Sequence, residues 1–217
     1  MIHEFTVRQL ADLSVASHRP LVICDVDEVV VHFTSAFESY LSKRQMWLDT
    51  SSFALNGNIR HAANGTSVSA EEIAEMIDDF FALHTAELDA IDGAIAALHD
   101  LSAVSSVVML TNLPHHARDK RIENLRKHGL DFPVVTNSGP KGPAIRHLAD
   151  LTRETVVFVD DSPGFIASAR QHAPEVHLIH FLHDERFARH LAHFDFVSLR
   201  TSTWNEALPH IKTLIGA

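Results

Sequence analysis

Short apolar runs alternate with amphipathic stretches over most of this chain. The first run covers residues 21–24, follows Pro20 and stops at an acidic residue. A short run that is apolar at every position is typical of a strand buried on both faces of a parallel sheet. Similar runs, each interpreted as a strand, cover residues 106–110, 132–136, 155–159 and 176–181.

Stretches with helical spacing separate these runs, at residues 93–101, 115–128, 142–151 and 164–172. Gly129 follows the second of them, as glycine commonly does where a helix ends. Repeated strand–helix units of this length predict an α/β fold, a Rossmann-like parallel sheet flanked by helices with right-handed crossovers. Further helices are expected at residues 6–17, 185–193 and 204–215.

The alternation is interrupted between residues 34 and 90. Residues 35–48 have helical spacing, whereas residues 50–65 are irregular and rich in Asn and Ser. Ser69 and Glu72 form the signature of a capping box, which opens a second helix. No strand is expected in this stretch. The pattern predicts a small all-helical insertion, residues 34–90, in a core domain made of residues 1–33 and 91–217.

Composition and charge narrow the possible functions. The 217 residues suffice for one domain, or for a core with an insertion. The formal net charge of -10 argues against a nucleic-acid binder, which would show a basic face. Small anionic substrates are still compatible, because a local group of amides, lysine and metal can override the global charge. The oligomeric state is not indicated by the sequence.

The same features favour a cytoplasmic protein without membrane contact. Cys24 is the only cysteine, so no intramolecular disulfide can form, which fits a reducing compartment. Residues 1–10 mix polar and apolar side chains, so we expect no signal peptide. No apolar run approaches the length of a membrane-spanning helix.

Polar side chains follow three of the predicted strands. They are Asp25 and Asp27 after the first, Thr111 after the second, and Asp160 with Asp161 after a later one. Parallel strands end at the same edge of a sheet, where open α/β folds bind their ligands, so these groups can converge. Lys141 begins a helix at that edge. Clustered carboxylates are costly without a counter-charge, and Mg²⁺ with oxygen ligands would supply one.

The order of these groups resembles the haloacid dehalogenase (HAD) superfamily, whose four motifs fall here on the expected elements. The first is matched by Asp25-Val26-Asp27-Glu28-Val29, the second by Thr111-Asn112, the third by Lys141 and the fourth by Asp160-Asp161-Ser162-Pro163. The resemblance implies a Rossmann-like core and identifies residues 34–90 as a C1-type cap.

The resemblance also implies a role for each group. Asp25 would be the nucleophile that forms an aspartyl-phosphate, and Asp27 would act as general acid and base. Lys141 and Mg²⁺ would reduce the repulsion between Asp25 and an anionic phosphate. Thr111 and Asn112 would hold phosphate oxygens. The metal ligands would be Asp25, the backbone carbonyl of Asp27, Asp160 and Asp161.

Asp27 favours phosphoryl transfer over carbon–halogen cleavage, because dehalogenases of the superfamily lack an acid at that position. The sequence therefore predicts a Mg²⁺-dependent phosphatase, a phosphoric monoester hydrolase acting on a small phosphorylated metabolite. Two alternatives stay open, a phosphomutase and a catalytically weak protein that binds a phosphorylated ligand. Glu28 supports the latter, because it stands where phosphatases often carry Gly and could alter the following turn or reach toward the cap.

Several weaker candidates have simpler explanations. Arg60 is a candidate substrate contact from the cap, although a polar loop is the favoured interpretation. His115 follows the second motif and is a second such candidate. Lys43 could form a Schiff base, but a solvated helix face explains it better. The 17 histidines include no metal-binding motif, and we interpret most of them as surface residues.

Overall fold

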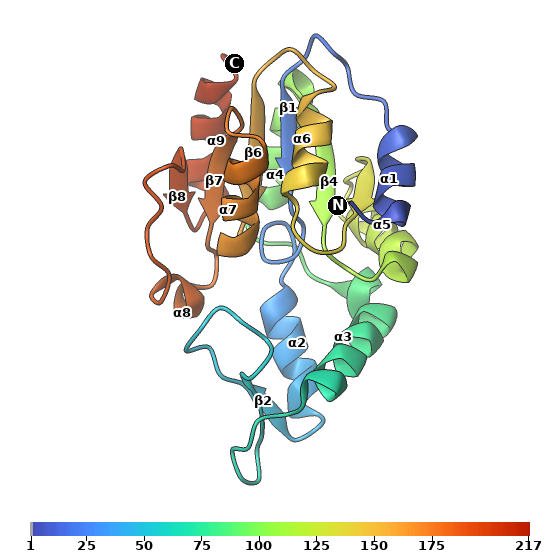
Figure 1. The fold of residues 1–217 in the computed structure, drawn as a ribbon, viewed down its shortest axis with the longest axis vertical. Helices are drawn as coiled ribbons and strands as arrows, with labels where there is room; N and C mark the ends of the chain where they lie inside the picture. Colours follow the sequence, from blue (N-terminus) through green and yellow to red (C-terminus); the bar gives the residue numbers. More distant parts are fainter. Residues whose placement is uncertain (1) are drawn as a thin grey trace.

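The computed structural model describes residues 2–217 and is built around a six-stranded parallel sheet of order β5-β4-β1-β6-β7-β8 (Figure 1). Every residue of β1 and β6 is buried, as expected for strands covered on both faces. The predicted α/β fold is confirmed. The strands are β1 (Leu21–Cys24), β4 (Ser106–Thr111), β5 (Val134–Thr136), β6 (Val156–Asp160), β7 (His177–Phe181) and β8 (Leu199–Thr201).

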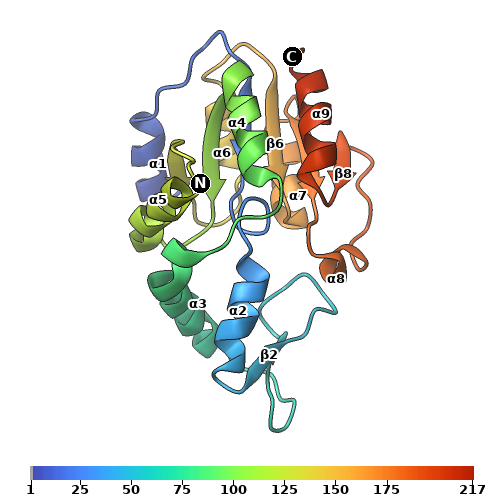
Figure 2. The same cartoon turned by 180° about the vertical axis from the view of Figure 1, so that it is seen from behind.

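Helices cover both faces of the sheet, and each face has its own apolar core (Figures 1 and 2). Alternate residues of β1 serve the two cores, with Val22 on one face and Ile23 on the other. One face carries α1 (Glu4–Ala11), α6 (Gly142–Ala149) and α7 (Pro163–His172). The other carries α4 (Ala94–Val104), α5 (Arg118–Lys127) and α9 (Trp204–Leu214).

The sheet order places the polar strand ends side by side. β1 lies between β4 and β6, with Cys24 level with Met109 on one neighbour and Val159 on the other. The residues that follow these positions therefore emerge at one edge of the sheet. They are the residues that the sequence singled out for chemistry.

Residues 34–90 lie beyond this edge, in the lower part of Figure 1. The segment contains α2 (Phe33–Ser42), α3 (Ala70–His84) and the antiparallel pair β2 (Met46–Leu48) and β3 (Ile59–His61), and the 3₁₀ helix Thr85–Glu87 follows α3. The prediction of an all-helical insertion is wrong in this respect. Strands of three residues are too short to show the alternation that identifies a strand in a sequence.

The tail also differs from the prediction. The helix α8 covers only Glu185–Ala188, and the strand β8, which was not predicted, adds to the sheet beside β7. The short 3₁₀ helix His115–Ala117 precedes α5. Within residues 2–217, none of the helices combines the length and apolarity needed to cross a membrane.

The close packing of α6 on α7 generates a prediction about Gly142, which follows Lys141. A Cβ atom at Gly142 would lie 2.3 Å from the carbonyl oxygen of Ser168 in α7. We expect Gly142→Ala to lower the free energy of unfolding by about 1–3 kcal/mol, because the backbone of α7 must move. Urea denaturation would measure this change.

Gly164→Ala is the matched control, because the nearest atom to a Cβ there is the Ser162 hydroxyl oxygen at 3.7 Å. That variant should be as stable as the wild type, or slightly more stable, because alanine favours the helix. Equal effects of the two substitutions would contradict the packing argument.

Candidate active site

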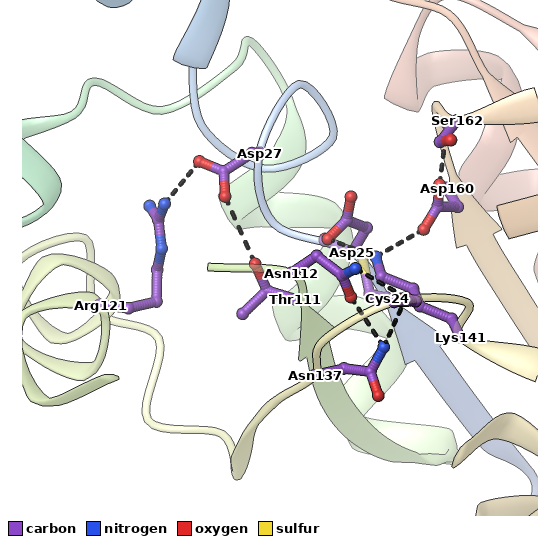
Figure 3. Close-up of polar contacts among 11 residues, drawn as sticks. Cys24, Asp25, Asp27, Thr111, Asn112, Arg121, Asn137, Lys141, Asp160 and Ser162 are labelled. Atoms are coloured by element: carbon purple, nitrogen blue, oxygen red, sulfur yellow. Dashed lines mark hydrogen bonds and ion pairs between the residues drawn. The ribbon is translucent and has the colours of Figure 1, made fainter. Parts of the chain in front are cut away.

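The centre of the site is a buried ammonium group between two carboxylates. Lys141, at the start of α6, places Nζ 2.7 Å from Asp25 Oδ1 and 2.6 Å from Asp160 Oδ2 (Figure 3). The side chains of Lys141 and Asp160 are fully buried. Burial alone would lower the pKa of Lys141, but Asp160 and Asp25 outweigh it and raise that pKa above its usual value. Lys141 is therefore a permanent cation.

A third carboxylate completes the cluster. One oxygen each from Asp25, Asp160 and Asp161 can be chosen so that all lie within 4.8 Å of one another. Burial is the main reason that the pKa of Asp25 rises to about 7, despite the opposing effect of Lys141. Burial and the neighbouring carboxylates of Asp160 and Asp25 raise the pKa of Asp161 well above its usual range. The cluster thus holds more negative charge than Lys141 offsets.

The donor set of this cluster fits a hard divalent cation. All three residues offer carboxylate oxygens, the ligands that Mg²⁺ prefers. The contact of Lys141 with Asp25 Oδ1 is short but lacks hydrogen-bond geometry, so that buried oxygen has no hydrogen-bond partner. A second oxygen, Asp160 Oδ1, accepts a hydrogen bond of 2.8 Å from the Ser162 amide. Asp25 and Asp161 also line the cavity described below, so a cation there would be open to a ligand.

His180 on β7 contacts the backbone of the carboxylate cluster. Its Nε2 lies 3.0 Å from the carbonyl oxygen of Asp161, and the side chain is buried. Burial lowers the pKa of His180 to about 4, so the ring is neutral at physiological pH and donates this hydrogen bond. His180 thereby fixes the backbone that carries Asp161.

Asp27 has a different set of partners, although it is only two residues from Asp25. Its Oδ1 is 2.5 Å from Nη2 of Arg121, and its Oδ2 accepts a hydrogen bond of 3.3 Å from the Thr111 hydroxyl (Figure 3). Arg121 is fully buried on α5. Asp27 is thus held apart from the three-carboxylate cluster by a cation of its own.

The sequence interpretation missed Arg121, because α5 is a polar helix in which one more arginine resembles a solvated residue. The position of Arg121 relative to apolar residues of the same helix could have identified it as buried. Ala117, Arg121 and Leu125 recur every four residues and lie on one face, and all three are buried. A charged residue on the apolar face of a helix requires a partner, which here is Asp27.

Glu28 connects the site to α2. Its backbone has φ of 60°, in the left-handed region that favours glycine. Its carboxylate accepts a hydrogen bond of 2.5 Å from the amide of Thr34, in the first turn of α2. Burial raises the pKa of Glu28. The sequence raised two possibilities for Glu28, an altered turn and a contact with the insertion. The structure shows the contact with the insertion.

A cavity of about 360 Å³ lies between the strand ends and the 34–90 segment. Asp25, Asp27 and Asp161 are among its lining residues. Asn112 also lines it, but its side-chain amide donates to the carbonyl oxygen of Gly139 at 2.8 Å. The Asn112 side chain therefore holds the neighbouring loop, and the Thr111 hydroxyl is likewise engaged by Asp27.

Arg60 and His115, the other candidate substrate contacts, do not line the cavity. Arg60 Nε is 3.1 Å from Asp49 Oδ2, so the guanidinium stabilises the β2–β3 pair. His115 Nδ1 is 2.6 Å from the Thr136 hydroxyl, and its ring stacks on His3 beside α1. Both side chains are held in place by local structure, and the structure does not support the prediction that they touch a substrate.

Comparisons of the sequence with protein-family models and with curated proteins found no match. Solved structures with similar folds do exist. A haloacid dehalogenase-like family hydrolase from Streptococcus pneumoniae aligns with 89% of this chain and 98% of its own, with a TM-score of 0.61 and 14% identity. A HAD family hydrolase from Deinococcus radiodurans, solved with bound phosphate and sodium, aligns over 92% and 97%, with a TM-score of 0.60 and 15% identity.

An L-2-haloacid dehalogenase has a comparable similarity. It aligns with 90% of this chain and 99% of its own, with a TM-score of 0.58 and 13% identity. Because a phosphate-bound hydrolase and a dehalogenase share this architecture, the architecture alone does not decide the reaction. The resemblance carried by the four motifs is confirmed at the level of the fold: the chain has the fold of the haloacid dehalogenase-like hydrolases.

Proposed function

We propose that this protein is a Mg²⁺-dependent phosphatase that hydrolyses a small phosphorylated metabolite through an aspartyl-phosphate, with residues 34–90 acting as its cap. One observation carries the proposal. Asp25 pairs with Lys141 within the three-carboxylate cluster, whereas Asp27 is held separately by Arg121 and Thr111. Two carboxylates in different environments suit two different roles, nucleophile and general acid.

The charge balance supports the metal. The proposed metal cluster contains the carboxylates of Asp25, Asp160 and Asp161 and the ammonium group of Lys141. With all four groups ionised, the balance of -3 and +1 leaves -2, which one divalent cation would offset. Asp25, Asp160 and Asp161 would hold Mg²⁺, which when bound supplies Lewis-acid stabilisation of charge on the phosphate oxygens.

The proposed reaction has two steps. The carboxylate of Asp25 attacks phosphorus, the bond to the leaving oxygen breaks, and Asp27 gives its proton to that oxygen. Asp27 then takes a proton from a water molecule that attacks phosphorus, which releases phosphate and regenerates Asp25. Lys141 opposes the rise that burial causes in the pKa of Asp25, and Arg121 with Thr111 orients Asp27.

The cavity supports phosphoryl transfer over dehalogenation of a haloacid. A 2-haloacid carries a carboxylate that needs a counter-cation in a desolvated site. No lysine or arginine is among the cavity-lining residues of the described chain.

We also propose that the protein works in the cytoplasm. The buried, free thiol of Cys24 fits a reducing compartment.

Asp25→Asn tests the nucleophile. An amide keeps the shape of the side chain but is a far weaker nucleophile, so phosphate release from an aryl phosphate should fall about 10³-fold or more. A colorimetric assay in the presence of Mg²⁺ measures this rate. Asp131→Asn, a change at an exposed residue, should leave the rate unchanged. Turnover retained by Asp25→Asn would reject the covalent mechanism.

Asp27→Asn tests the general acid. An alkoxide leaving group needs a proton and an aryloxide needs it much less, so the loss should depend on the substrate. We expect the rate of alcohol release in the first turnover, which precedes the hydrolysis step that both esters share, to fall about 10²–10⁴-fold for an alkyl phosphate and much less for an aryl phosphate with a weakly basic leaving group. Equal losses for both esters would assign Asp27 a structural role instead.

Metal affinity should depend on pH. In the metal-free protein the pKa of Asp25 is about 7, so below pH 7 a cation must displace a proton. Mg²⁺ binding should therefore weaken as pH falls through 7, by about tenfold per unit for one proton released. Calorimetry in two buffers with different ionisation enthalpies would count the protons. An affinity that is constant between about pH 6 and 8 would contradict the assignment of Asp25 as a ligand.

A further inference from the structure

We infer that the phosphate ester bound at this site carries a compact, uncharged and largely apolar alcohol group. The inference rests on the proposed phosphatase function for its reaction and concerns the part of the substrate that leaves. It depends on the cavity between the strand ends and the 34–90 segment. Both carboxylates and apolar side chains line that cavity.

Besides the carboxylates, the cavity is lined by apolar side chains from separate segments. Phe33 from α2 and Ile77 with Phe81 from α3 contribute on one side, and Leu55 contributes from the loop between β2 and β3. Phe165 from α7 and Phe187 from α8 contribute from the core. Apolar surface of this kind binds an apolar group by removing it from water.

The 34–90 segment and the segment after β7, which both contribute to this apolar lining, contact each other. The rings of Phe53 and Phe187 meet edge to face, with centroids 5.5 Å apart. Arg186 donates from Nη1 and Nη2 to the two carboxylate oxygens of Glu38, at 2.7 and 3.0 Å. Such a bidentate pair has a defined geometry. The apolar lining therefore forms a compartment between two parts of the chain.

Among the described lining residues, the cavity has no lysine or arginine to pair with a second anionic group. Its charged lining residues are the acids Asp25, Asp27, Glu28, Asp161 and Asp184, and His183 is the one titratable base that accompanies them among the described lining residues.

The nearby cations are already paired. Lys141 contacts Asp25 and Asp160, Arg121 contacts Asp27, and Arg186 contacts Glu38 and Asp184. A carboxylate or second phosphate on the leaving group would lose its hydration beside acids, without a cation in return.

The volume limits the size of the leaving group. About 360 Å³ is near the lower end of the range for small-molecule pockets, roughly 300–1,000 Å³. The phosphate would lie next to Asp25 in the proposed reaction, so the remainder of the cavity suits an aromatic ring or a short alkyl chain.

The test compares kcat/KM, in the presence of Mg²⁺, for straight-chain alkyl phosphates from ethyl to hexyl. A second series carries a terminal carboxylate on chains of the same length. We expect kcat/KM to rise about two- to fourfold for each added methylene. The carboxylated esters should be at least about tenfold poorer than their uncharged counterparts. A flat or falling dependence on chain length, or a preference for the carboxylated series, would overturn the inference.

Two variants on α3 provide a matched pair. Ile77→Lys places a cation in the cavity and should weaken the dependence on chain length while raising relative kcat/KM for carboxylated esters. Leu83→Lys makes the same change on the same helix at an exposed residue outside the lining, and should resemble the wild type. If Ile77→Lys does not fold, Leu55→Lys in the loop replaces it. A folded lining variant with unchanged selectivity would count against the inference.

Binding of alkylphosphonates separates this inference from the proposed function, because their P–C bond is not a substrate bond for this mechanism. Calorimetry on the Mg²⁺-loaded protein should show Kd falling about two- to fourfold per methylene. Such a trend without hydrolysis of any ester would reject the phosphatase and retain the apolar compartment. Hydrolysis combined with a Kd independent of chain length would retain the phosphatase and reject the compartment.

Discussion

The bridge from Lys141 to Asp25 and Asp160 is the interaction on which the site depends. It joins the start of α6 to the ends of the adjacent strands β1 and β6. Each charge is buried, so the free-energy cost of its desolvation is offset only by the opposite charges beside it. Loss of one partner in such a group typically costs about 3–5 kcal/mol, since an uncompensated charge remains. The same contacts that stabilise this sheet edge thus hold the proposed nucleophile in place.

A second pair, Arg121 with Asp27, explains how two acids separated by one residue can differ in role. Lys141 and Arg121 approach from different helices, α6 and α5, on opposite faces of the sheet. Asp25 is thereby drawn into the carboxylate cluster and Asp27 is drawn away from it. Without two separate cations the neighbouring carboxylates would face a shared environment, and the division into nucleophile and general acid would have no physical basis.

The parts of this structure that could be predicted from the sequence are those marked by repeated or long residue patterns. Strands buried on both faces were recognisable from unbroken apolar runs, and the polar residues after them located the sheet edge. The three-residue strands β2, β3 and β8 were missed because so few residues show no periodicity, whereas the equally short β5 was predicted from the longer run 132–136. Arg121 was missed, and the ion pair of Arg60 with Asp49 was not predicted, because the partner of a charged side chain depends on tertiary contacts.

Glu28 links the reaction site to the segment that would select the substrate. Its left-handed backbone costs about 1–2 kcal/mol relative to glycine. Its carboxylate bonds to the first turn of α2, and a capping interaction of this kind contributes about 1 kcal/mol. The two effects are similar in size, so the turn after Asp27 keeps its shape without glycine. Glycine would allow the same turn but would lack this hydrogen bond to α2. Glu28 therefore ties the position of the apolar lining residue Phe33 to the loop that carries both proposed catalytic acids.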